Sequence, residues 1–267
     1  MTDASASHTR PLEGTTVLGV FSHPDDESLA CGGTLARLAD AGARIVLVCA
    51  TRGERGSPTG PFQDDALGTQ RVAELRAAAS LLGVVEVTVL DYEDGNLKWA
   101  RATELQADIS SCLRRYRPSV VITFGKDGLY WHPDHIATHE QTAASVRIVS
   151  PPAPALYYVT LPPGALRGIV DVATARGWVA PPAGFWSLDP DAFGAETAPP
   201  TLVVDVKRWT ARKRAALRCH RSQFGVNGPF SLLDESDAHR WLGSECFHRA
   251  LDVGSNAYLL ERCLDSA

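Results

Sequence analysis

Four short apolar runs alternate with helix-like segments over the first half of this 267-residue chain. The runs cover residues 15–21, 44–51, 84–92 and 119–125, and the helix-like segments cover 26–41, 70–82, 103–116 and 135–148. Continuous apolar runs are typical of strands buried on both faces, and strand–helix alternation is typical of a parallel sheet. The pattern predicts an α/β fold: a Rossmann-like, doubly wound, mostly parallel sheet with helices on both faces.

The pattern changes between residues 150 and 200, which are rich in Pro, Ala and Gly with scattered aromatic residues such as Trp178, Phe185 and Trp186. We expect this segment to be an insertion draped over the domain and to form a wall of the substrate site. A further strand is expected at 201–206 and a helix at 207–221. The whole of 15–267 is expected to form a single domain, and the small polar residues 1–14 are expected to be flexible.

The composition excludes several classes of partner. Hydrophobic residues make up 45% of the chain and charged ones 21%, which suits a sizeable core. The net charge is −5 and no long basic run occurs, so neither nucleic acid nor an anionic membrane is an expected partner. No apolar run approaches the ~20 residues of a membrane span, and the N-terminus lacks a secretory signal pattern. Six cysteines without a C-x-x-C pair indicate reduced thiols in a cytoplasmic protein, with homo-oligomerisation left open.

Two tetrapeptides follow apolar runs: His23-Pro24-Asp25-Asp26 after the first and His132-Pro133-Asp134-His135 after the fourth. Catalytic groups gather at the carboxyl ends of strands in open α/β sheets. A catalytic zinc ion needs about three protein ligands and one open position for water. His23, Asp26 and His135 supply that number of ligands, and the sequence therefore predicts a zinc site.

The remaining residues of the two motifs supply acid–base groups. Asp25 adjoins a predicted ligand and is placed to act as general base toward water. His132 is predicted to stabilise an oxyanion or to protonate a leaving amine, with Asp134 orienting it. Each tetrapeptide alone is also typical of an ordinary helix-capping turn. His139, four residues after His135, is a rival ligand that we expect to lie on the helix surface instead.

Taken together, the two motifs resemble the PIG-L/LmbE-type zinc-dependent N-acetylglucosamine deacetylase family. Five further segments resemble family motifs: the loop Thr51–Gly56, the helix Arg71–Leu75, the turn Asp94–Leu97, the Gly128–Tyr130 stretch and the segment His220–Gln223. The resemblance covers most of residues 15–150 and scattered positions after 200, and it fails over 150–200.

The resemblance implies a function and a set of roles. The reaction would be removal of an N-acetyl group from an N-acetylglucosamine-containing small molecule, with one Zn²⁺ per chain, the ligands His23, Asp26 and His135, and Asp25 as base. It also implies an oxyanion role for Tyr130 and a sugar-hydroxyl contact for Arg71. Ordinary aromatic packing for Tyr130 and an ion pair with Glu74 for Arg71 remain open.

The main alternative is a zinc amidase for another amide, either a thiol conjugate or another N-acyl group. A nucleotide-binding module is disfavoured because no G-x-G-x-x-G follows the first strand. The sequence does not choose between Asp25 and His132 as the group that protonates the leaving amine.

Overall fold

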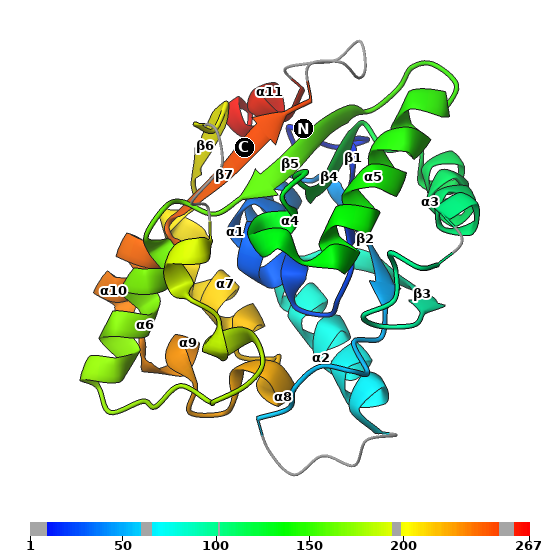
Figure 1. Ribbon diagram of the computed structural model, residues 1–267. Helices are drawn as coiled ribbons and strands as arrows, with labels where there is room; N and C mark the ends of the chain where they lie inside the picture. The colour runs from blue at the N-terminus through cyan, green and yellow to red at the C-terminus, as the bar shows by residue number, and fades with distance from the viewer. Residues whose placement is uncertain (1–9, 60–65, 101, 194–198, 251–258) are drawn as a thin grey trace, which may run out of the picture.

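The structure is a computed structural model that describes residues 10–59, 66–100, 102–193, 199–250 and 259–267. A seven-stranded sheet with the order β3-β2-β1-β4-β5-β7-β6 forms its centre (Figure 1). The strands are β1 (Thr16–Phe21), β2 (Arg44–Thr51), β3 (Val84–Tyr92), β4 (Val120–Phe124), β5 (Ala155–Thr160), β6 (Leu202–Asp205) and β7 (Ser244–Arg249). The first five are parallel, and β7 runs antiparallel to both of its neighbours. The predicted α/β architecture is confirmed.

Helices cover both faces of the sheet (Figure 1). One face carries α1 (Asp26–Asp40), α2 (Leu67–Leu82) and α7 (Thr210–Leu217), and the other carries α3 (Ala102–Tyr116) and α5 (Pro133–Ile148). The shorter helices are α4 (Gly128–Trp131), α6 (Ala165–Ala175), α8 (Arg221–Phe224), α9 (Pro229–Leu232), α10 (Glu235–Leu242) and α11 (Leu259–Asp265). Successive side chains of β1 fall into two separate cores, because neighbouring strand residues face opposite sides.

The order of the strands explains where a site can form. β1 lies between β2 and β4, so the connections from β1 and β4 leave the sheet toward opposite faces. Such a switch of direction opens a crevice at the carboxyl ends of the two strands. The first tetrapeptide motif follows β1 directly, and the second follows β4 after the short helix α4.

Three expectations from the sequence are corrected by the structure. The segment 150–200 is not only a draped insertion, because its early part supplies β5, an interior strand paired with β4, and then α6. The expected flexibility of residues 1–14 does not hold from Arg10 onward: Leu12 is buried and its N–H donates to the Ala41 carbonyl, while residues 1–9 lie outside the described part of the chain. The helix expected over 207–221 ends at Leu217 and is followed by the separate helix α8.

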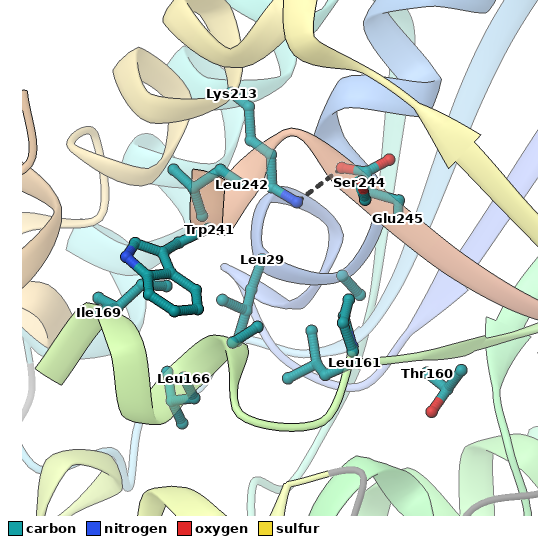
Figure 2. Close-up of a pocket in the computed structure, with 13 residues that line it drawn as sticks. Leu29, Thr160, Leu161, Leu166, Ile169, Lys213, Trp241, Leu242, Ser244 and Glu245 are labelled. Carbon is teal, nitrogen blue, oxygen red and sulfur yellow. Dashed lines mark hydrogen bonds and ion pairs between the residues drawn. The ribbon is translucent and has the colours of Figure 1, made fainter. Parts of the chain in front are cut away.

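Helix α1 is interrupted at Cys31, whose φ of −146° and ψ of 18° are not helical. The break frees the N–H groups of Gly33 and Thr34, and both donate to the carboxylate of Glu245, at 2.8 and 2.7 Å. The Lys213 ammonium binds the same carboxylate at 2.6 Å, beside a cavity of about 20 Å³ (Figure 2). Glu245 on β7 therefore caps the second half of the helix that begins at the site.

Candidate active site

The first motif forms the turn between β1 and α1. The His23 N–H donates to Asp26 Oδ2 at 2.7 Å, which closes the turn. Asp25 precedes the helix with a φ of +131°, a conformation that L-residues rarely adopt and that costs of order 1–3 kcal/mol. Strain of this kind persists only where the surroundings enforce it, so the contacts of Asp25 are informative.

The second motif forms the start of α5. His132 is the N-cap residue, and its Nδ1 accepts the Asp134 N–H at 3.2 Å, while Pro133 occupies the first helical turn. Because Nδ1 accepts, the neutral ring of His132 carries its proton on Nε2. The same turn buries His135 completely, with its ring stacked on Phe124 at a centroid distance of 3.9 Å.

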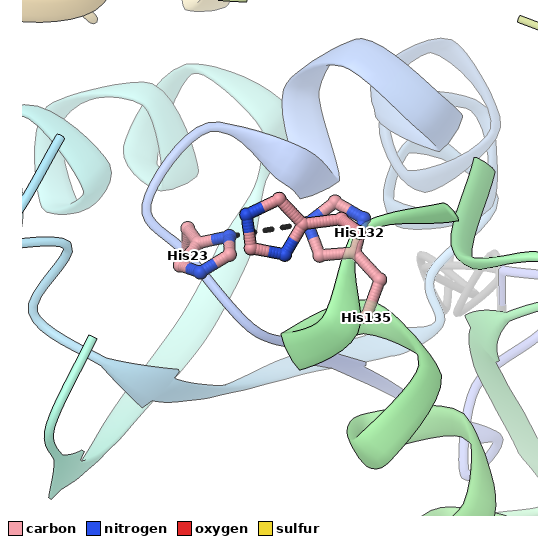
Figure 3. A group of neighbouring side chains, drawn as sticks. All are labelled: His23, His132 and His135. Atoms are coloured by element: carbon pink, nitrogen blue, oxygen red, sulfur yellow. Dashed lines mark hydrogen bonds between the residues drawn. The ribbon is translucent and has the colours of Figure 1, made fainter. Parts of the chain in front are cut away.

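The predicted metal ligands lie together. His23 Nδ1 is 3.1 Å from His135 Nε2, Asp26 Oδ1 is 3.3 Å from His135 Nε2, and Asp26 Oδ2 is 3.6 Å from His23 Nδ1. Two donors at 2.0–2.1 Å from one tetrahedral ion lie about 3.4 Å apart. His23 follows the end of β1 and His135 lies in the first turn of α5; their rings face each other, with His132 beside them (Figure 3).

The tautomers of the two histidines support a cation between them. His135 Nδ1 faces the Gly128 carbonyl at 3.1 Å and must donate to it, which leaves a lone pair on Nε2. His23 Nε2 faces the carboxylates of Asp94 and Asp134, at 3.1 and 3.3 Å, which leaves a lone pair on Nδ1. Two lone pairs 3.1 Å apart would repel, so this contact requires either a proton on His23 Nδ1, which makes His23 a cation, or a metal ion between the two nitrogens. A metal-bound histidine usually donates its other N–H to a carboxylate or carbonyl, as both do here.

The pKa shifts of His23 and Asp26 also indicate that this position favours positive charge. Burial alone lowers the pKa of His23, but hydrogen bonds to Asp134 and Asp94 and the charge of Asp26 outweigh it and raise the pKa to about 10. Burial alone raises the pKa of Asp26, but the charge and hydrogen bond of His135 hold it well below its usual range. The position therefore stabilises positive charge, and the residues present fit a divalent ion.

Asp25 lies beside the cluster without being part of it. Its carboxylate is 15% exposed and pairs with the Arg71 guanidinium at 3.0 Å. Burial raises the pKa of Asp25 to about 6, against the charge of Arg71, which lowers it. A carboxylate of this kind, in the cavity next to the metal ligands, suits a general base near neutral pH.

Arg71 contacts the protein on several sides. Its Nη1 donates to the Gly53 carbonyl at 2.8 Å, and its Nη2 donates to the Pro24 carbonyl at 2.9 Å as well as to Asp25. The side chain is 6% exposed, although it borders the cavity described below. The predicted sugar contact would therefore come from a guanidinium already engaged in holding the Asp25 turn, and the pairing with Glu74 considered from the sequence is not the contact observed.

The contacts of Asp134 differ from those that the sequence predicted, and those of Asp94 were not predicted. The Asp134 carboxylate, expected to orient His132, instead accepts from His23 Nε2 and from the N–H groups of Gly95 and Leu97. Only the backbone of Asp134 reaches His132. Asp94 was included only in a turn that resembles a family motif, with no role assigned, yet it contacts His23; its position after the third strand was the signal that could have identified it.

Of the two remaining residues considered from the sequence, Tyr130 borders the site and His139 does not. The Tyr130 ring lies 5.6 Å from His132 and 5.3 Å from His135 between centroids, and it packs on Phe193 at 4.7 Å. Burial raises the pKa of the Tyr130 phenol, so it stays protonated and able to donate. His139, the rival ligand, turns away: its Nδ1 donates to the Phe124 carbonyl at 2.9 Å and its ring packs on Tyr158.

A cavity of about 470 Å³ opens over these groups. Its polar side includes His23, Asp25, Asp94 and His132, and its apolar side includes Leu29, Leu129, Phe185, Leu188 and Phe224. Phe185 and Leu188 come from the segment 150–200, so this segment lines the cavity, and its role as a substrate wall stays a prediction. Phe185 is held by edge contacts with Tyr130, Trp186 and Phe193.

Comparison with known proteins now bears on this geometry. The family model PIG-L, described as GlcNAc-PI de-N-acetylase, matches residues 18–146. A 1D-myo-inositol 2-acetamido-2-deoxy-alpha-D-glucopyranoside deacetylase from Acidothermus cellulolyticus is 33% identical over 255 residues, covering 87% of each chain. The chain belongs to the PIG-L deacetylase family. The resemblance noted in the sequence is confirmed, and this PIG-L protein is an N-deacetylase.

Solved structures agree on the fold. A conserved protein from Thermus thermophilus, TT1542, is 26% identical with a TM-score of 0.58, covering 89% of this chain and 95% of that one. GalB, a 4-carboxy-2-hydroxymuconate hydratase from Pseudomonas putida, has a TM-score of 0.62 at 19% identity and covers 89% of this chain and 96% of that one. GalB is named as a hydratase and its likeness to this chain shows the fold alone, so the fold by itself does not determine the reaction. None of the described helices of this PIG-L protein combines the length and apolar character that a membrane crossing requires.

Proposed function

We propose that this PIG-L protein hydrolyses the N-acetyl group of a glucosamine unit joined to a small polyol of the inositol type. The observation that carries the proposal is that the facing ring nitrogens of His23 and His135 and the Asp26 carboxylate converge, 3.1–3.6 Å apart, beside Asp25. The inositol conjugate is supported by the name of the Acidothermus relative, whose similarity covers 87% of this chain.

His23, Asp26 and His135 would hold a zinc ion. The ion would polarise the amide carbonyl and lower the pKa of a water molecule toward ~7. Two histidines and one carboxylate are a usual donor set for catalytic zinc, and structural zinc sites are instead rich in cysteine. The Asp94 and Asp134 carboxylates fix the His23 tautomer, and the Gly128 carbonyl fixes that of His135.

The other residues divide the proton chemistry. Asp25 accepts the proton from water as the acetamide carbonyl is attacked, and Arg71 keeps its carboxylate aimed into the cavity. The proposed role of His132 follows from its tautomer: with Nδ1 bound to the Asp134 N–H, its Nε2–H donates to the developing oxyanion, and the Tyr130 hydroxyl joins it. The carboxylic acid formed on Asp25 then protonates the departing amine, since it is the group that has just gained a proton.

The test is acetate release from N-acetylglucosamine–inositol, with and without zinc, by the wild type and by Asp25→Asn. We expect Asp25→Asn to bind zinc normally and to lose about 10²–10⁴-fold in kcat. The matched control is Asp40→Asn, an aspartate that pairs with Arg212 outside the site and should keep full activity. Full activity in Asp25→Asn would refute the assignment of the base.

A second candidate is an amidase for a more apolar amide. The apolar side of the cavity, formed by Leu29, Phe185, Leu188 and Phe224, favours it. The same assay decides: faster hydrolysis of N-acyl substrates with a large apolar group than of the inositol conjugate would favour this candidate.

A further inference from the structure

The segment His220–Gln223 matched a family motif, but none of the chemistry above uses it. His220 lies at the start of α8, far beyond residues 18–146 that the family model matches. It is 1% exposed, and its Nε2 lies 3.2 Å from Glu27 Oε1 and 3.3 Å from Ser28 Oγ. Its other ring nitrogen has no hydrogen-bond partner among the described residues. The polar contacts of this buried ring are thus directed at the first turn of α1.

Glu27 connects His220 to the strained turn. Its Oε1 accepts from the Ser28 hydroxyl and from His220, and its Oε2 accepts the Asp25 N–H at 3.1 Å. Glu27 is also 1% exposed, so no solvent competes for these positions. The Asp25 amide belongs to the residue with a φ of +131°, and its position sets the direction of the Asp25 carboxylate.

We infer that His220 is a positioning residue for the general base, acting through Glu27 on the backbone of Asp25. Arg71 holds the Asp25 side chain from α2, and Glu27 holds its N–H from α1. Without His220, the Glu27 carboxylate loses one of its donors and is free to leave the Asp25 amide. The strained turn then relaxes, and the base moves away from the ligands.

A second contact of α8 makes it possible to distinguish the proposed role of His220 from a role in merely holding α8 against the protein. The Ser222 hydroxyl and N–H both bind the Glu74 carboxylate on α2, at 2.6 and 3.1 Å. Ser222 is fully buried, like His220, but its bonds do not lead to Asp25. Ser222→Ala is therefore a matched control that weakens the attachment of α8 alone.

The test compares His220→Gln with His220→Asn. The glutamine amide reaches about as far as Nε2 and keeps a donor for Glu27, whereas asparagine is one methylene too short. We expect His220→Asn to lower kcat by about 10–100-fold with little change in KM or zinc content. His220→Gln should recover most of the activity, and Ser222→Ala should keep kcat. Equal kcat in the two His220 variants, or an equal loss in Ser222→Ala, would overturn the inference.

This inference rests on the proposed function, so a second readout is independent of activity. Hydrogen–deuterium exchange over residues 23–29 should be faster in His220→Asn than in His220→Gln or Ser222→Ala. If the wild type releases no acetate, the proposed function fails, but the exchange data still decide whether His220 holds the turn. Should His220→Asn not fold, Glu27→Ala removes the same link from the other side, and a normal kcat in that variant would overturn the inference.

Discussion

Removing the ammonium group of Lys213 should destabilise this PIG-L protein strongly without touching the site. Lys213 and Glu245 are 3% and 2% exposed, and the Nζ–Oε1 distance is 2.6 Å. Lys213→Met leaves the Glu245 carboxylate buried without a countercharge, a change that costs about 3–5 kcal/mol in typical proteins. The N–H groups of Gly33 and Thr34 still bind the carboxylate, so we expect the lower end, about 3 kcal/mol.

The assay is denaturant and thermal unfolding followed by circular dichroism. For a chain of this size, about 3 kcal/mol corresponds to a Tm lower by roughly 6–12 °C. Lys207→Met is the control, because Lys207 pairs with Asp205 at an exposed position, and its loss should change stability by no more than about 0.5 kcal/mol.

A double variant tests the reason for the loss. Lys213→Met with Glu245→Gln removes both charges, and the amide oxygen still accepts one of the two helix N–H groups. We expect it to be more stable than Lys213→Met alone, because no buried charge remains. A Lys213→Met protein as stable as the Lys207→Met control would refute the reasoning about the buried pair.

Three further predictions follow from the site and the surface. Chelation of the metal should abolish acetate release, and added zinc should restore it. The His135→Ala variant should contain little zinc when its metal content is measured. Activity that survives chelation would contradict the metal site. Phe185→Ala should raise KM by about 2–12-fold with a nearly unchanged kcat, since it removes an aromatic face from the cavity wall; a fall in kcat alone would contradict a binding role. Burial raises the pKa of Asp40, but hydrogen bonds from Arg212 and Trp209 outweigh this effect and lower the pKa in the folded protein. The ionised Asp40 carboxylate therefore stabilises the fold at a pH above the unfolded pKa. This stabilisation is lost as the pH falls through the folded pKa. The Tm difference between wild type and Asp40→Asn should therefore shrink as the pH falls below about 4, the unfolded pKa of an aspartate, and a constant difference would contradict the pairing.

The sequence determined the parts of the fold that depend on local pattern. Apolar runs predicted β1 to β4 closely, and strand–helix alternation predicted a parallel sheet. Burial on both faces imposes a continuous apolar run on the interior strands β1, β2 and β4, whereas the residues of the edge strand β3 are partly buried or exposed. β5 escaped prediction because Pro and Gly surround its six residues and hide the strand pattern. β7 escaped because its sequence SECFHR carries polar residues whose partners are distant in the chain.

For the site, too, the sequence predicted some features and only the tertiary structure decided others. Motif spacing placed His23, Asp26 and His135 at two strand ends, and the sheet order then brought their donors within 3.1–3.6 Å. The sequence did not indicate that the Asp134 carboxylate faces His23, because the direction of a side chain at a helix start depends on what packs against it. The sequence also assigned no role to Asp94, Glu27 or His220, because the contacts of Asp94 with His23 and of His220 with Glu27 join distant parts of the chain. Residue types and spacing thus determined which groups can do the chemistry, and tertiary packing decided which way each group points, because hydrogen bonds between distant segments exist only after the sheet has formed.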